Sequence, residues 1–193
     1  MGDGVTGVIN DRLYVLSGCF QADPPHGYFE TCDPLFYRYN PATDKWVELP
    51  APSAALGPYL GSPFLSGVID GKFYVMGDMY YTREAWFAVY DPATNQWTKL
   101  TTGFAKGRGG AASAVLGAKL YVIGGTRYND ATDAWDTLAV TVRYDPTTGR
   151  WLRLADLPGP RTGIAASRIN LNGTARIEVV GGSGTGNNLQ YTP

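Results

Sequence analysis

Short runs of alternating hydrophobic and polar residues follow one another along the chain, with polar turns between them. Val5-Thr6-Gly7-Val8-Ile9 and Leu13-Tyr14-Val15-Leu16 are two such runs, and Asn10-Asp11-Arg12 separates them. Runs of this length, rich in β-branched and aromatic residues and bounded by a turn, predict paired antiparallel strands. The chain therefore begins with a predicted β-hairpin.

The same paired pattern recurs three more times. The later pairs lie at 64–69 with 72–76, at 111–116 with 120–125 and at 163–169 with 177–182. Two further strands follow each of the first three pairs, at 35–39 and 46–49, at 86–90 and 97–100, and at 138–144 and 151–154. The last pair is followed by one short predicted strand at 188–191. The pattern predicts four-stranded units, the last of them incomplete.

An eight-residue sequence recurs at the turn between the third and fourth strands of each complete unit. The copies are Tyr39 to Trp46, Tyr90 to Trp97 and Tyr144 to Trp151, and their tryptophans lie 51 and 54 residues apart. Each copy has Pro third and Asn or Asp second, which together favour a closed turn. Tyr and Trp then lie on flanking strands, so both rings are predicted to pack between neighbouring units. A period of about 50 residues is typical of propeller blades.

Three sequence motifs resemble the kelch repeat. They are Leu120-Tyr121-Val122-Ile123-Gly124-Gly125, the octapeptide Tyr144 to Trp151, and Pro160-Arg161 before the next predicted strand. The resemblance implies an all-β fold of kelch-type β-propeller blades, each made of four antiparallel strands. Residues 1–193 are then one propeller segment, with blades at about 5–50, 62–101 and 109–155 and a partial blade at 161–193.

About three and a half blades cannot close a ring, because closure normally needs at least four. The sequence therefore predicts an incomplete ring or one closed by oligomerisation. Two interpretations stay open: blades are missing before Met1, leaving a truncated monomer, or a homodimer completes the propeller.

Composition limits the classes of binding partner that we expect for this chain. Charged residues are 17% and the formal net charge is −1, so the basic surface that nucleic acid requires is not expected. No long apolar segment and no signal peptide is recognisable, which predicts a soluble chain that does not bind membranes. The compartment stays unknown, and an extracellular location stays open if the N-terminus is truncated. Cys19 and Cys32 are either a disulfide or two free thiols.

No cofactor or metal site is predicted. His26 is the one histidine, and there are two cysteines, too few for an ordinary four-ligand zinc site or for copper chemistry of the galactose-oxidase kind. Nucleophile elbows, phosphate loops and dinucleotide fingerprints are also missing. No catalytic residue is assigned, which leans against an enzyme without excluding one.

The kelch resemblance implies that ligands contact the loops on one face of the blades. These loops carry aromatic and arginine side chains, the residue types that dominate binding hot spots. The candidate ligand-binding residues are His26, Tyr28, Tyr80, Tyr81, Arg83, Arg127, Tyr128 and Trp135, with Arg108 and Arg161 just before a first strand.

Plainer interpretations stand beside these. Trp86 aligns with core positions, which favours packing. Trp135 lies outside the three octapeptides and either binds ligand or covers a blade end. Arg108 and Arg161 either touch ligand or pair with a carboxylate. His26 is most simply solvated.

Three function classes remain. The preferred one is a non-catalytic binding module that presents aromatic and arginine-rich loops to a protein or a carbohydrate. The second is a sugar-acid epimerase or lyase that uses Arg108, Arg161 and a loop carboxylate. The third is a structural half-propeller for homo-oligomeric assembly.

Overall fold

The computed structural model describes residues 4–18, 34–57, 60–79, 84–103, 107–183 and 189–191. The chain forms two compact units, Met1–Gly107 and Arg108–Pro193. Both are built from antiparallel sheets, so the all-β fold class is confirmed.

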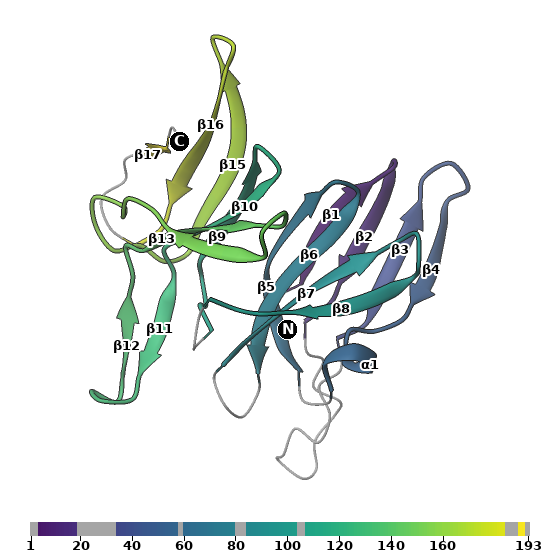
Figure 1. The fold of residues 1–193 in the computed structure, drawn as a ribbon, viewed down its shortest axis with the longest axis horizontal. Coiled ribbons are helices and arrows are strands. Elements are labelled where there is room, and N and C mark those ends of the chain that lie inside the picture. Colours follow the sequence, from purple (N-terminus) through teal and green to yellow (C-terminus); the bar gives the residue numbers. More distant parts are fainter. Residues whose placement is uncertain are drawn as a thin grey trace. The chain divides into compact units, whose positions relative to one another are not determined.

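The first unit contains two four-stranded sheets (Figure 1). The first sheet runs in the order β1 (Val5–Ile9), β2 (Arg12–Leu16), β3 (Phe36–Asn40) and β4 (Lys45–Leu49). The second sheet runs in the order β5 (Leu60–Ile69), β6 (Lys72–Met79), β7 (Ala85–Asp91) and β8 (Gln96–Leu100). The short helix α1 (Ser53–Leu56) connects the two sheets.

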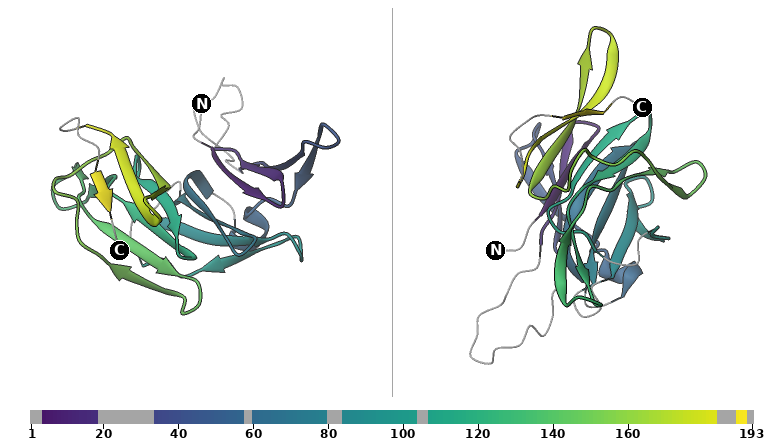
Figure 2. Two further views of the ribbon diagram at one scale, coloured as in Figure 1. Left: turned by 90° about the horizontal axis from the view of Figure 1, so that it is seen from above. Right: turned by 90° about the vertical axis from the view of Figure 1, so that its left-hand side faces the viewer.

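The second unit contains a third and a fourth sheet and a separate hairpin. The third sheet comprises β9 (Ala112–Leu116), β10 (Lys119–Ile123), β13 (Thr141–Asp145) and β14 (Arg150–Arg153). The fourth comprises β15 (Ile164–Leu171), β16 (Thr174–Gly181) and β17 (Leu189–Tyr191). Its β15–β16 hairpin is long and extends beyond the third sheet (Figure 2). The hairpin of β11 (Thr126–Asn129) and β12 (Ala134–Thr137), between β10 and β13, pairs only with itself among the named strands.

The core of the first unit lies between its two sheets. The first sheet contributes Val5, Ile9, Tyr14, Leu16 and Phe36, and the second contributes Leu60, Phe73, Val75, Trp86, Ala88, Tyr90 and Trp97. Gly7 makes this close approach possible, because a Cβ there would lie 2.7 Å from the Phe73 ring. Trp86 is 2% exposed, which confirms its interpretation as a core residue.

The core of the second unit lies between the third and fourth sheets. Ala112, Ala114, Leu116, Tyr121 and Ile123 pack against Ile164, Ile177 and Val179. The chain turns after β10 at Gly124 and Gly125, whose φ angles are 61° and 93°. A Cβ on Gly125 would lie 2.7 Å from that of Ala111, so this corner has no room for a side chain.

The octapeptide turns also form as predicted. In each, the Asn or Asp side chain accepts a hydrogen bond from the backbone N–H two residues later, at 3.1 Å for Asn40, 2.9 Å for Asp91 and 3.0 Å for Asp145. The Tyr and Trp rings lie together, with centroids 5.0, 5.4 and 5.1 Å apart in chain order. In the second sheet the pair Tyr90 and Trp97 fills the space between the sheets.

Candidate functional site

The hairpin β11–β12 is a fourth copy of the octapeptide. Tyr128 to Trp135 shares Tyr, Asn, Ala, Thr, Asp and Trp, in the same positions, with Tyr39 to Trp46. Asp130 stands where the other copies have Pro. The expectation that Trp135 lies outside the repeat is therefore wrong, and so is the expectation of an irregular loop, because these residues form paired strands.

The geometry of the fourth copy matches that of the others. The Asn129 side chain accepts a hydrogen bond from the N–H of Ala131 at 3.1 Å. The Tyr128 hydroxyl donates to Asp133, as the Tyr39 hydroxyl does to Asp44 at 2.8 Å. The rings of Tyr128 and Trp135 meet edge to face with centroids 5.5 Å apart. A local sequence signal thus determines the hairpin, and the hairpin positions Trp135.

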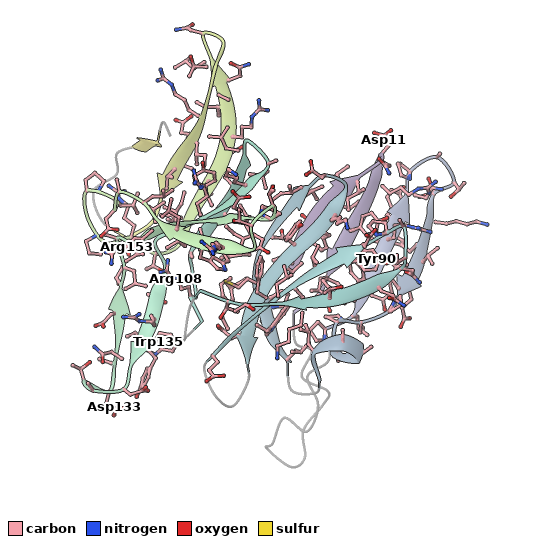
Figure 3. All side chains as sticks on the ribbon, viewed as in Figure 1. Asp11, Tyr90, Arg108, Asp133, Trp135 and Arg153 are labelled. Carbon is pink, nitrogen blue, oxygen red and sulfur yellow. The ribbon has the colours of Figure 1, made fainter. Side chains whose placement is uncertain are left out.

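The two faces of this hairpin differ in charge. Tyr128 pairs with Trp135, and Thr126 pairs with Thr137. Because side chains alternate along a strand, these four share one face. Along the strands, that face carries two rings and two threonine hydroxyl groups, and the Tyr128 hydroxyl donates to the Asp133 carboxylate of the turn. Trp135 is 61% exposed on it, and its side chain is shown in Figure 3.

The opposite face is charged. It carries Arg127 opposite Asp136 and Asn129 opposite Ala134. The amide of Asn129 donates to the Asp136 carboxylate at 2.9 Å. The structure therefore places the candidate Arg127 on the other face from Tyr128 and Trp135.

The candidates Arg108 and Arg161 are buried, with exposed fractions of 4% and 6%. The Arg108 guanidinium donates to the carbonyl of Val140 at 3.3 Å, and that of Arg161 to the carbonyl of Gly181 at 3.4 Å. Burial, with repulsion from Arg127 and Arg153, lowers the pKa of Arg108 to about 10. It therefore remains a cation at neutral pH.

The backbones flanking both arginines support the base of the hairpin. The N–H of Thr126 donates to Gly109 at 2.7 Å, next to Arg108. The N–H of Gly125 donates to the carbonyl of Arg161 at 2.8 Å, and the N–H of Arg161 donates to Leu138 at 3.1 Å. Arg108 and Arg161 are thus integrated into the structure that anchors Trp135.

A perturbed carboxyl group lies in the first unit. Asp78, at the end of β6, has its pKa raised to about 6 by burial. Its Oδ1 is buried and has no hydrogen-bond partner in the described part of the chain. The sequence carries no signal for this burial, because it involves the distant Gly107.

A cleft of about 540 Å³ also lies in the first unit and had no sequence signal. Leu56 of α1 lines it, together with Glu84, the start of β7 and the end of β8, which includes Lys99. It contains none of the residues that the sequence marked as candidates.

The remaining candidates lie outside the described residues. They are His26, Tyr28, Tyr80, Tyr81 and Arg83, and the pair Cys19 and Cys32. Within the described ranges, no three His, Cys, Asp or Glu side chains gather in a way that could hold a metal ion. The described helix is also too short to cross a bilayer.

Comparison with known proteins identifies the repeat. The model of the Kelch motif matches residues 107–158. Kelch-like protein terF of Aspergillus terreus is 32% identical over 163 residues, which are 80% of this chain and 34% of that protein. An N-acetylneuraminate epimerase of Yersinia enterocolitica is 32% identical over 111 residues, 56% of this chain and 28% of the enzyme.

A solved structure shows the same fold. The structure of YjhT is 20% identical in sequence and superposes with a TM-score of 0.63 over 93% of this chain and 58% of its own. The chain spans about a third or less of the length of the two relatives named above. Together with the four-stranded antiparallel sheets, these matches show that the chain belongs to the kelch-repeat family.

Proposed function

We propose that this chain is a non-catalytic binding module, and that its ligand contacts the face of the β11–β12 hairpin that carries Tyr128 and Trp135. The observation that carries the proposal is the exposure of Trp135, 61%, on a hairpin that fixes its position. In the same repeat, Trp97 is 7% exposed. A large ring held in water by an ordered scaffold costs little conformational entropy on binding, which favours Trp at hot spots.

A carbohydrate fits this face better than a protein does. The face combines the Trp135 and Tyr128 rings with the hydroxyl-bearing Thr126 and Thr137. The apolar side of a sugar ring packs on an aromatic ring, while its hydroxyl groups exchange hydrogen bonds with neighbouring hydroxyls. A protein partner would need about 800 Å² of this surface, more than one face of a short hairpin offers. A neutral glycan is therefore the favoured ligand class, with a protein as the other.

A glycan array followed by calorimetric titration of the best sugar tests the proposal. Trp135→Ala should raise the Kd by roughly 30-fold or more, the usual scale of a hot spot. Trp46→Ala is the matched control, because Trp46 holds the same position in another copy of the octapeptide and is 54% exposed. Equal Kd values for the wild type and Trp135→Ala would contradict the assignment of this face, and an array without a bound glycan would contradict the ligand class.

An enzyme of the epimerase kind is the second candidate. It is supported by the relative named N-acetylneuraminate epimerase and by the Asp78 carboxyl, whose raised pKa of about 6 suits proton transfer near neutral pH. Arg108 and Arg161, which the sequence suggested for this activity, are buried and bonded to backbone carbonyls within the second unit.

Proton NMR of N-acetylneuraminate epimerisation tests this second candidate. The wild type should accelerate the reaction, and Asp78→Asn should slow it. Turnover unaffected by this change would end the enzyme hypothesis, as would a wild type that does not accelerate the reaction.

A further inference from the structure

The first sheet has one covered face and one uncovered face. The covered face packs on the second sheet through Val5, Ile9, Tyr14, Leu16 and Phe36. The strand registers place eight residues on the other face: Thr6, Val8, Leu13, Val15, Tyr37, Tyr39, Trp46 and Glu48. Val8 is 61% exposed and Trp46 is 54% exposed. We call these eight residues the open face.

The repeat gives the open face an exact counterpart on the second sheet. The equivalent positions there are Ser66, Val68, Phe73, Val75, Ala88, Tyr90, Trp97 and Lys99. Phe73, Val75 and Ala88 have 0% exposure, Tyr90 1% and Trp97 7%. In the second sheet this surface is thus an interface between sheets. The open face carries the same kind of side chains, with Glu48 in the position of Lys99, and has no neighbouring sheet in the described part of the first unit.

The polar contacts of the covered interface have counterparts as well. The Ser66 hydroxyl donates to the backbone carbonyl of Thr6 at 2.9 Å, and Trp97 Nε1 donates to the carbonyl of Pro50 at 2.8 Å. On the open face, Thr6 and Trp46 occupy the positions of Ser66 and Trp97. The open face therefore has both the apolar surface and the donor types that join two sheets.

We propose that the open face packs on the fourth sheet of a second copy of this chain. In the first unit, the surface that packs against a face of this kind is the covered face of the first sheet. The fourth sheet has a related surface. Ala165 pairs with Val180 and Ser167 with Glu178, in the positions where Val5 pairs with Leu16 and Gly7 with Tyr14, so a carboxylate stands where the first sheet has a tyrosine. Val180 is 38% exposed.

Side-chain sizes support this pairing. Phe73 packs over Gly7, where a Cβ would lie 2.7 Å from its ring. On the open face the equivalent of Phe73 is the smaller Leu13, and on the fourth sheet the equivalent of Gly7 is the larger Ser167. The exchange approximately conserves volume, which packed interfaces tolerate best. The inference does not depend on the proposed function, because the open face contains no candidate ligand residue.

Sedimentation equilibrium over a range of protein concentrations tests the proposal on the full chain. The wild type should form a dimer. Trp46→Ala should raise the dimer Kd by roughly 30-fold or more, and Val8→Arg and Val180→Arg should each give monomers, because each replaces an apolar side chain in the contact by a larger, charged one. Trp135→Ala is the matched control and should dimerise like the wild type. Circular dichroism checks that each variant is folded.

Each alternative result decides against the proposal. A wild type that is monomeric at every concentration would overturn it, as would a Val8→Arg variant that still dimerises. If Val8→Arg is monomeric but Val180→Arg dimerises, the open face has another partner surface and the fourth sheet is the wrong assignment. Loss of dimerisation in Trp135→Ala would place the contact on the β11–β12 hairpin instead.

Discussion

Replacing Asp78 by Asn should make the protein more stable at neutral pH and leave its stability unchanged in acid. The Asp78 carboxyl is largely buried, and its Oδ1 lacks a hydrogen-bond partner among the described residues. Asn has nearly the same shape but carries no charge. The substitution therefore removes the cost of a buried carboxylate without opening a cavity.

The magnitude follows from the pKa. Burial raises the pKa of Asp78 from 3.8 to about 6. Between these pH values the folded state holds a proton that the unfolded state has released, so the free energy of unfolding falls as pH rises. The full loss is about 3 kcal/mol at 1.36 kcal/mol per pH unit. The contribution of the Asp78 carboxyl to the free energy of unfolding is complete below pH 3.8 and is lost as the pH passes through about 6.

Urea denaturation of both proteins from acidic to mildly alkaline pH measures this effect. The difference between Asp78→Asn and the wild type should grow by about 3 kcal/mol across that range. Asp145→Asn is a control of opposite sign. A hydrogen bond from Lys119 lowers the pKa of Asp145, so its stabilisation is present above pH 3.8 and is lost in acid. A difference for Asp78→Asn that does not vary with pH would refute the reasoning.

Three further substitutions test the packing and the repeat, each by thermal or urea unfolding. Gly7→Ala should destabilise the protein by about 1–3 kcal/mol through overpacking, because its Cβ would meet the Phe73 ring at 2.7 Å; wild-type stability would contradict the described sheet packing. Gly125→Ala should cost at least as much, since it adds a clash with Ala111 to a φ of 93°. Asp130→Pro should stabilise the protein by about 0.4–1 kcal/mol by restoring the octapeptide proline, and a loss of stability would show that the fourth turn differs from the others.

The sequence predicted the local structure well because the signals are local. Asn or Asp before Pro closes the turn by a hydrogen bond two residues along, as at Asp91 and Ala93, and alternation identifies the paired strands. The irregular register of β5 near Pro63 was not predicted, because bulges adjust one strand to its neighbour and leave no periodic signal. The hairpin β11–β12 was missed because Asp130 replaces the proline that marked the other copies.

The candidate site was predicted less completely, for a physical reason. Tyr128 and Trp135 were identified by residue type, and the structure brings them together as a ring pair. Arg127 was grouped with them, but strand alternation puts it on the opposite face. The burial of Arg108 depends on surroundings that include the carbonyl of Val140, 32 residues away. Contacts of that kind join distant segments, and one sequence without a fold does not specify them.

The octapeptide shows how far a local signal extends. All four copies bring a Tyr and a Trp ring within 5.0 to 5.5 Å of one another, yet Trp97 is 7% exposed, Trp46 54% and Trp135 61%. The motif therefore determines the hairpin and its ring pair, whereas burial depends on what packs against the pair. Trp97 has the first sheet as its neighbour. Trp46 and Trp135 carry the same preformed apolar surface without that cover. Because the two tryptophans lie on different sheets, single substitutions separate self-association at Trp46 from ligand binding at Trp135.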